Sequence, residues 1–201
     1  MRVNRAQAEK NRETVIDVAS RLFRRHGFDG IGLKDLMKGA GLTQGAFYKQ
    51  FVSKEDLAAQ ASKRAFESAS RRWSAAAAAH PKNPLRAVLG FYLSMDHRGE
   101  KMDGCPIVAL GADAARQSEE VKEPFEAGIK AHLEVLGQLI GETDAKESRD
   151  KAMAVLSTMV GAVVLSRAVN DERLSEQLLQ AAAKGVLMMS STGDVQQGSL
   201  R

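Results

Sequence analysis

Apolar side chains recur at helical spacing along most of the chain. In residues 11–26 they stand at Val15, Ala19, Leu22 and Phe23, while Arg21, Arg24 and Arg25 fall mostly elsewhere on the helical wheel. This spacing is typical of an amphipathic helix that buries one face. The long stretches of Ala, Leu, Met, Lys, Glu and Arg show no alternation of period two, which would indicate strands. The pattern therefore predicts an all-α protein.

Two short helices are predicted to follow this first helix. The earlier of them has an apolar stripe of about two turns at Leu33, Leu36, Met37 and Ala40. Gly41 comes directly after it, and glycine is the residue best able to adopt the positive φ that ends many helices. Thr43 is placed to cap the next helix, with its hydroxyl accepting hydrogen bonds from backbone N–H groups two or three residues on.

The third helix has two chemically different sides. On a helical wheel Ala46, Phe47 and Phe51 share one arc, and the opposite arc holds Gln44, Gly45, Tyr48 and Lys49. The first arc is suited to packing on the two preceding helices. The second arc is flat at its glycine and otherwise cationic or hydrogen-bonding. Two short helices joined by a tight turn behind a longer helix form a helix-turn-helix, whose second helix enters the DNA major groove.

The rest of the chain is predicted to be helical. A long helix runs from Ser53 towards Pro81 and Pro84, and continuous helices of this kind can transmit a movement from one domain to another. The later helices are predicted at about 84–96, 106–117, 119–140, 146–169 and 174–190. The last two are apolar almost all round, so a second copy of the chain is expected to cover them in a two-fold dimer built on an intermolecular four-helix bundle. Burial within one chain is the alternative.

Charge divides the chain into a basic head and an acidic body. Residues 1–73 hold 15 Lys or Arg and 8 Asp or Glu, whereas residues 74–201 hold 14 and 17. A basic head favours a polyanionic partner, although an ordinary solvated surface is the alternative. We expect a helix-turn-helix DNA-binding domain over 10–70, a helical effector-binding and dimerisation domain over 71–190, and a flexible tail over 191–201.

Several function classes find no support in the sequence. The four histidines are scattered, and no zinc-protease motif, nucleophile elbow, phosphate loop or dinucleotide fingerprint occurs, so we expect no enzyme, metal or cofactor. Cys105 is the only cysteine, which leaves no intrachain disulfide. No signal peptide precedes the first helix, and no window approaches 18 uninterrupted apolar residues. A cytoplasmic protein with no membrane partner is the expectation.

One run of residues resembles a known family. The string LKDLMKGAGLTQGAFYKQFVSKEDL, preceded by Ala19, Leu22, Phe23, Gly27 and Phe28, is similar to the DNA-binding region of TetR-family transcriptional regulators. The resemblance implies a homodimer that binds a palindromic operator, with repression as the default and a small-molecule effector bound by the C-terminal domain. Met37 and Gln50 depart from the family pattern, which usually has a small residue and a histidine there.

The resemblance also implies roles for individual residues. Thr43, Tyr48 and Lys54 are similar to phosphate contacts, Lys34 opens the second helix near the DNA backbone, and the amide of Gln50 can donate to phosphate. Gln44, Gly45 and Lys49 face the base edges, where Gln suits adenine and Lys suits guanine. The alternatives are a half-buried anchor at Tyr48, a capping region at Lys54 and a solubilising charge at Lys34.

The body contains candidates for effector binding. An apolar cavity between its helices is expected near Phe91, Tyr92, Met95, Cys105, Val108, Phe125, Ile129 and Met159, with a plain core as the alternative. Cys105 precedes Pro106 at a predicted helix start, where a thiolate would be stabilised, so it is either an electrophile or redox sensor or a buried thiol. An architectural DNA-binding protein with a filled body and weak sequence preference is the competing function.

Overall fold

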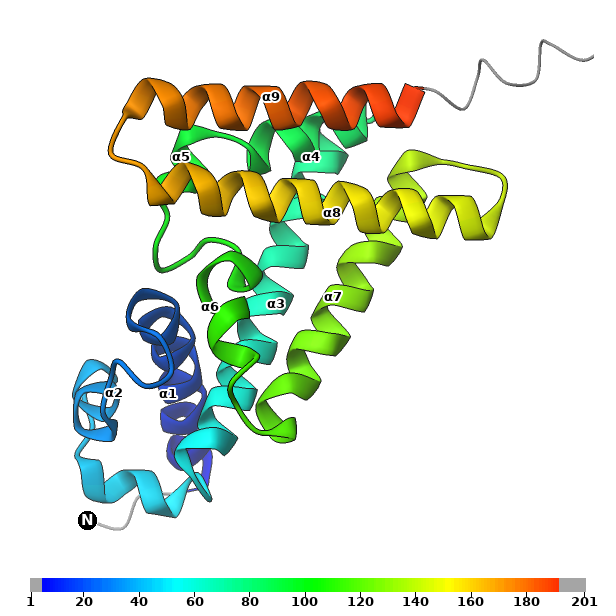
Figure 1. The fold of residues 1–201 in the computed structure, drawn as a ribbon. Helices are drawn as coiled ribbons and strands as arrows, with labels where there is room; N and C mark the ends of the chain where they lie inside the picture. Colours follow the sequence, from blue (N-terminus) through cyan, green and yellow to red (C-terminus); the bar gives the residue numbers. More distant parts are fainter. Residues whose placement is uncertain (1–4, 192–201) are drawn as a thin grey trace, which may run out of the picture. The chain divides into compact units, whose positions relative to one another are not determined.

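The computed structural model describes residues 5–191, and every regular element in that range is a helix. The elements are α1 (Arg5–His26), α2 (Leu33–Gly39), the 3₁₀ helix η1 (Gln44–Lys49), α3 (Lys54–Ala79), α4 (Pro84–Tyr92), α5 (Met95–Gly99), α6 (Pro106–Ala114), α7 (Glu119–Ile140), α8 (Ala145–Ala168) and α9 (Glu172–Ser191). The all-α prediction is confirmed (Figure 1). The predicted tail lies outside the described residues apart from Ser191, which ends α9.

Contacts group the chain into two units, and their boundary falls within α3 and α7. The first unit holds the residues up to Ala69 together with Lys101–Gly128, and the second holds Ser70–Glu100 and the residues from Ile129 onward. The division expected from the sequence, at residue 70, differs from this grouping for residues 101–128. These residues belong with the first unit because α6 packs against α1.

The first unit is built on one aromatic-rich core. Phe28 lies against Phe23 and Phe125, with ring centroids 5.3 and 6.3 Å apart, and Phe66 meets Phe125 edge-on at 5.2 Å. Edge-to-face and tilted pairs of this kind add to the stabilisation from area burial. Met37 is fully buried in the same core, where its flexible side chain fills space between the helices. The first unit thus packs α1, α2, α3 and α7 around shared rings.

A buried arginine joins α1 to the loop before α6. The Arg24 side chain is 3% exposed, and its guanidinium donates to the carbonyl oxygens of Ser20 at 3.0 Å and Gly104 at 2.8 Å. Asp103 lies 3.9 Å from Arg24 and 3.0 Å from Arg21. A buried charge is tolerated only when it is paired and hydrogen-bonded, as Arg24 is. Arg24 therefore fixes the chain that leads into α6.

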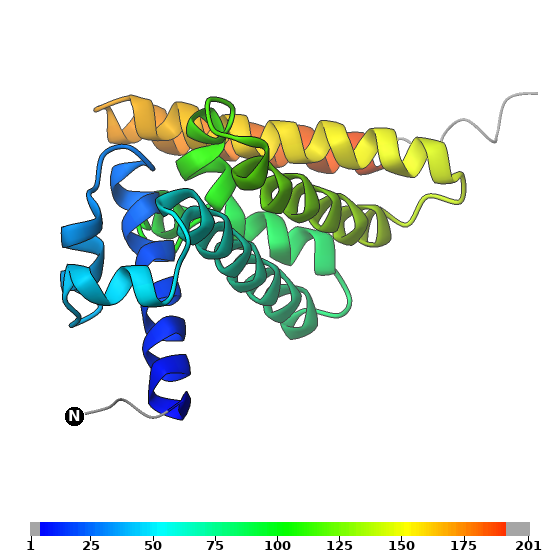
Figure 2. The same cartoon turned by 90° about the horizontal axis from the view of Figure 1, so that it is seen from below.

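The second unit contains the long pair α8 and α9. The two helices lie side by side and run in opposite directions in both views (Figures 1 and 2). Helix α8 is long and apolar enough to span a membrane by length and composition, but it buries Val155, Met159 and Val163 in the second unit. Large apolar side chains on the pair stay exposed at Met153, Val164, Leu165, Leu174 and Met188.

One predicted helix is interrupted in the structure. The stretch expected to be continuous over 84–96 ends as α4 at Tyr92, and α5 begins at Met95. The break forms because Ser94 acts as an N-cap, its hydroxyl accepting from the His97 backbone N–H at 3.1 Å. Serine competes in this way with a continuing helix.

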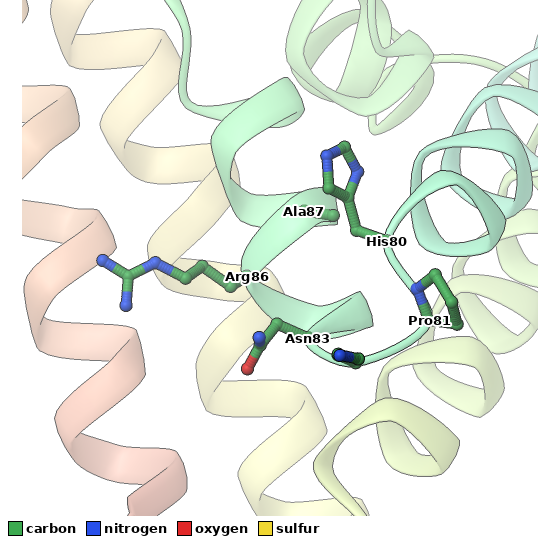
Figure 3. Close-up of a pocket in the computed structure, with 6 residues that line it drawn as sticks. His80, Pro81, Asn83, Arg86 and Ala87 are labelled. Atoms are coloured by element: carbon green, nitrogen blue, oxygen red, sulfur yellow. The ribbon is translucent and has the colours of Figure 1, made fainter.

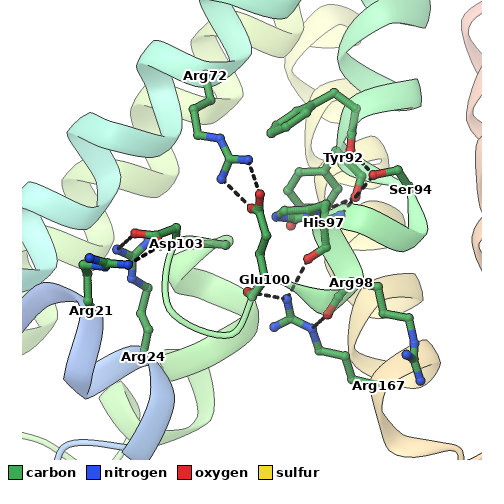
Figure 4. Close-up of polar contacts among 12 residues, drawn as sticks. Arg21, Arg24, Arg72, Tyr92, Ser94, His97, Arg98, Glu100, Asp103 and Arg167 are labelled. Atoms are coloured by element: carbon green, nitrogen blue, oxygen red, sulfur yellow. Dashed lines mark hydrogen bonds and ion pairs between the residues drawn. The ribbon is translucent and has the colours of Figure 1, made fainter.

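Two arginines of the second unit bind the ends of each other's helices. Arg98 of α5 donates to the Ser166 carbonyl at the end of α8, at 2.9 Å, and Arg167 of α8 donates to the carbonyls of His97, Arg98 and Glu100 (Figure 4). Carbonyls in the last turn of a helix lack the usual i+4 N–H partner, so the arginines bind groups that a helix end leaves available.

The groups around Glu100 and His97 shift the pKa values of both residues. Arg72 binds the Glu100 carboxylate through two hydrogen bonds of 2.6 and 2.7 Å, which lowers the pKa of Glu100. Burial lowers the pKa of His97 from its ordinary value, against the opposing effect of its hydrogen bond to the Tyr92 carbonyl at 2.6 Å. Burial therefore favours the neutral form of His97.

The lowered pKa of His97 predicts a loss of stability in mild acid. The unfolded chain binds a proton at this histidine at a higher pH than the folded chain does, so protonation favours unfolding as the pH falls below about 6.5. We expect the free energy of unfolding to decrease between about pH 7.5 and 5.5, and the decrease to be smaller in His97→Gln. Denaturant titrations across that range test this. His80→Gln, at an exposed position, should keep the wild-type pH dependence, and an equal loss in both variants contradicts the prediction.

Gly128 is required by the aromatic core. A Cβ added at this position in α7 would overlap the Phe66 ring, whereas one added at the exposed Gly90 of α4 would meet nothing within 4 Å. We expect Gly128→Ala to destabilise the protein by about 1–3 kcal/mol through overpacking. Gly90→Ala should leave stability unchanged or raise it by up to about 1 kcal/mol, because alanine is the better helix former. Thermal unfolding of both variants measures this, and a neutral Gly128→Ala would contradict the role of the close contact.

Candidate nucleic-acid interface

The turn between α2 and η1 is set by its glycine. Gly41 has a φ of +72°, its N–H donates to the Lys38 carbonyl at 3.0 Å, and the Leu42 N–H donates to the Met37 carbonyl at 2.9 Å. This pair of bonds is the Schellman motif, in which a residue with positive φ closes the helix. The prediction that Gly41 ends the second helix is confirmed, and the chain reverses into η1 within four residues.

The next helix differs from the prediction in two respects. It is a 3₁₀ helix over Gln44–Lys49, with the Gln50 N–H donating to the Phe47 carbonyl at 2.8 Å. Thr43 occupies the N-cap position, but its side chain accepts no capping hydrogen bond. Short helices with i to i+3 bonds are common where a segment has too few residues to settle into an α-helix.

Burial separates the two sides of η1 as the helical wheel predicted. Phe47 and Phe51 are buried and stack with centroids 5.4 Å apart. Tyr48 is 67% exposed, so the alternative of a half-buried anchor at this position is not supported. The remaining residues of the outward arc, Gln44, Gly45 and Lys49, are exposed as well. This outward face of η1, defined by Gln44, Gly45, Tyr48 and Lys49, offers hydrogen bonds and one positive charge to a partner.

The other predicted contact residues surround that face less uniformly. Thr43 and Lys34 are exposed, whereas Lys54 and Gln50 are partly buried. The Oε1 atom of Gln50 is buried without a hydrogen-bond partner. The sequence suggested that the Gln50 amide could replace the usual histidine in a phosphate contact. Burial of its oxygen makes the amide less available for that contact.

Val52 was missed by the sequence reasoning. It is 91% exposed directly after the last ring of η1. An apolar side chain this exposed can contact a thymine methyl group, a role for which apolar residues are used on DNA. The helical wheel of the third helix ended at Phe51, so it did not include Val52.

The chain after Val52 is fixed by a cap on α3. Ser53 accepts from the Asp56 backbone N–H at 3.0 Å, and the Asp56 carboxylate accepts from the Val52 N–H at 3.0 Å. This reciprocal arrangement is close to a capping box. The cap that the alternative for Lys54 invoked is thus formed by Ser53 and Asp56.

The eight residues expected near an effector are distributed over both units. Cys105, Val108 and Phe125 belong to the first unit, and the other five belong to the second. Phe125 is part of the aromatic core described above, so the plain-core alternative holds for it. Cys105 is buried at the N-cap of α6, where its side chain makes no capping hydrogen bond.

A pocket opens elsewhere in the second unit, at the turn from α3 to α4. Its volume is about 590 Å³, and its lining consists of His80, Pro81, Lys82, Asn83, Arg86 and Ala87 (Figure 3). None of the eight residues proposed for effector binding lines this pocket. Its lining includes two basic side chains, Lys82 and Arg86.

Comparison with known proteins matches both parts of the chain. Residues 15–61 match the family described as bacterial regulatory proteins, tetR family, and residues 81–191 match the C-terminal domain of LmrA/YxaF-like transcriptional regulators. The HTH-type transcriptional regulator LmrA of Bacillus subtilis is 29% identical over 161 residues, which span 78% of this chain and 86% of LmrA. The HTH-type transcriptional repressor NemR of Escherichia coli is 25% identical over 69% of this chain and 71% of its own length.

Solved structures match the fold. A TetR transcriptional regulator from Chloroflexus aurantiacus has a TM-score of 0.76 and 26% identity, covering 91% of this chain and 95% of its own. The reduced form of E. coli NemR has a TM-score of 0.73 and 21% identity, covering 88% and 95%. Matches of this length include both units of the present chain.

The separation of the two sides of η1 predicts opposite stability effects at neighbouring positions. Phe47→Ala should cost about 3–5 kcal/mol of unfolding free energy, because it removes a fully buried ring from the core. Tyr48→Ala should change stability by no more than about 1 kcal/mol, since most of its side chain is already in solvent. Urea denaturation compares the two. A large loss at Tyr48 would mean that its ring supports the fold and is not free for a partner.

Proposed function

Because the chain belongs to the TetR family of bacterial transcriptional regulators, we propose that it is a homodimeric repressor that leaves a palindromic operator when a small molecule binds. Members of this family are DNA-binding transcription factors and not enzymes. The observation that carries the proposal is the outward face of η1, which is exposed while the aromatic rings behind it are buried.

The residues of that face and its surroundings are suited to two kinds of DNA contact, one to base edges and one to phosphates. Gln44 and Lys49 reach base edges, where an amide pairs with adenine and an ammonium with guanine acceptors, and Gly45 allows close approach. Tyr48, with Thr43, donates to phosphate oxygens, as do the flanking Lys34 and Lys54. Gln50 is the weakest member of the set because half of its amide is buried.

A dimer gives the operator its symmetry. Exposed Val164, Leu165 and Met153 on α8, with Leu174 and Met188 on α9, leave the long helix pair with uncovered apolar surface. A second copy related by a two-fold axis would cover it in a four-helix bundle. The η1 elements of the two copies would then bind two half-sites of the operator. The half-sites would be separated by one helical turn of DNA, roughly 34 Å, or by a multiple of that distance.

Release by an effector follows from the reciprocal coupling of two binding sites. The effector would bind better to an arrangement of the dimer that does not fit DNA. It then lowers the affinity of the dimer for DNA, and DNA lowers the affinity of the dimer for the effector by the same factor. The candidate pocket residues in the second unit are Phe91, Tyr92, Met95, Ile129 and Met159, and Cys105 in the first unit is proposed as an electrophile or redox sensor. Repression is proposed because it is the default in this family and because one relative, NemR, is a repressor. The site of action would be the cytoplasm, where the operator lies.

Selection of bound duplexes from a random library tests the DNA-binding proposal. We expect enrichment of a palindrome, and a roughly 10- to 100-fold weaker affinity of Tyr48→Ala for that site at fixed salt, the scale of a hydrogen bond to a charged group. Lys49→Met should instead relax the preference for one base in each half-site.

The control for both variants is Lys122→Ala, an exposed change on α7 far along the chain from η1, which should bind like the wild type. Enrichment without any palindrome, or with little sequence preference, would favour an architectural DNA-binding protein. A folded protein that enriches no duplex at low salt would contradict the proposal.

A further inference from the structure

Arg12 of α1 lies where two sets of contacts with residues 43–53, the recognition region, meet. Its Nη2 atom donates to Oε1 of Gln60 on α3 at 2.5 Å. Gln60 in turn donates to the Asp56 carboxylate, and that carboxylate accepts the Val52 N–H. The Asp56 N–H binds the Ser53 hydroxyl. A chain of hydrogen bonds therefore runs from Arg12 to the backbone that leaves η1.

The second set of contacts runs through aromatic rings. The Arg12 guanidinium lies over the Phe51 ring, 5.3 Å from its centroid, at a distance typical of a cation–π interaction. Phe51 stacks on Phe47 at 5.4 Å, and Phe47 meets the Tyr48 ring edge-on at 5.3 Å. One guanidinium thus touches the end of a ring series that reaches the exposed tyrosine.

We propose that Arg12 is a positioning residue for the DNA-contacting face of η1, acting through Phe51 and Gln60 and not by touching DNA itself. This inference rests on the proposed function. A six-residue 3₁₀ helix cannot hold its own orientation, so contacts at its C-terminal end determine how Tyr48 and Lys49 are presented. Arginine suits the role because its planar fork can stack on a ring and donate a directed hydrogen bond at once.

A second bridge between α1 and α3 provides a matched comparison. Arg64 of α3 forms ion pairs with Glu13 and Asp17 of α1, and these side chains raise the pKa of Arg64. Arg64 also lies 3.7 Å from Glu67 of its own helix, and none of these three carboxylates belongs to residues 43–53. Arg12 and Arg64 therefore join the same two helices, but only Arg12 is connected to η1.

The experiment compares Arg12→Met with Arg64→Met on the selected operator. Both variants keep an unbranched side chain and lose a guanidinium. Binding is measured over a range of salt, at a temperature at which circular dichroism shows both proteins folded. We expect Arg12→Met to lose roughly tenfold or more in affinity, the scale of one charge-assisted hydrogen bond, and Arg64→Met to bind within about twofold of the wild type. Hydrogen exchange should become faster at the amides of 46–52 in Arg12→Met alone.

The salt dependence separates positioning from a direct phosphate contact. If Arg12 touched phosphate, its loss would reduce the slope of log affinity against log salt by about 0.9 for each contact, and Arg12→Lys would restore binding. A positioning residue leaves the slope unchanged, and lysine does not replace it. A reduced slope with rescue by lysine overturns the proposal, as does equal binding by Arg12→Met and Arg64→Met.

Two further outcomes are covered by the same design. Should Arg12→Met fail to fold, Gln60→Leu breaks the hydrogen-bond chain while leaving Arg12 over Phe51, and a selective loss of affinity is again expected. If the wild type binds no duplex, the proposed function fails, but hydrogen exchange at 46–52 still tests whether Arg12 orders the recognition region. Equal exchange in the two methionine variants would then overturn the inference by itself.

Discussion

The burial of Phe47 and Phe51 is the constraint on which the outward face of η1 depends. A helix of six residues has almost no stability of its own, because nucleation costs more than so few hydrogen bonds return. The two stacked rings anchor it to a core that already includes the side chains of α1, α2 and α3. Only with this anchor can the opposite side consist of a glycine and polar groups. The proposed function and the proposed role of Arg12 both follow from that asymmetry.

Local pattern was enough to predict most of the fold. The apolar stripes placed α1, α2 and the later long helices, and Gly41 marked the turn correctly because its role depends on its own φ. The same patterns separated the buried and exposed sides of the recognition element. This separation was predicted correctly although η1 is a 3₁₀ helix and not an α-helix. Phe47 lies on the buried side and Tyr48 on the exposed side in a helix of either type.

The features that sequence missed depend on partners distant in the chain or on competition between local bonds. Ser94 interrupts a helix that its neighbours would continue, and Thr43 stands in a capping position without capping. Arg24 and Arg12 find partners 80 and 48 residues away, which no periodicity reveals.

The reciprocal arginines of the second unit have a consequence for how this family can diverge. Arg98 and Arg167 both bind main-chain carbonyls, which every residue type provides. Neighbouring side chains on α5 and α8 can therefore change without removing either arginine's partner. Among relatives that keep both arginines, these links between α5 and α8 would leave no correlated substitutions, so methods that infer contacts from such correlations would overlook them.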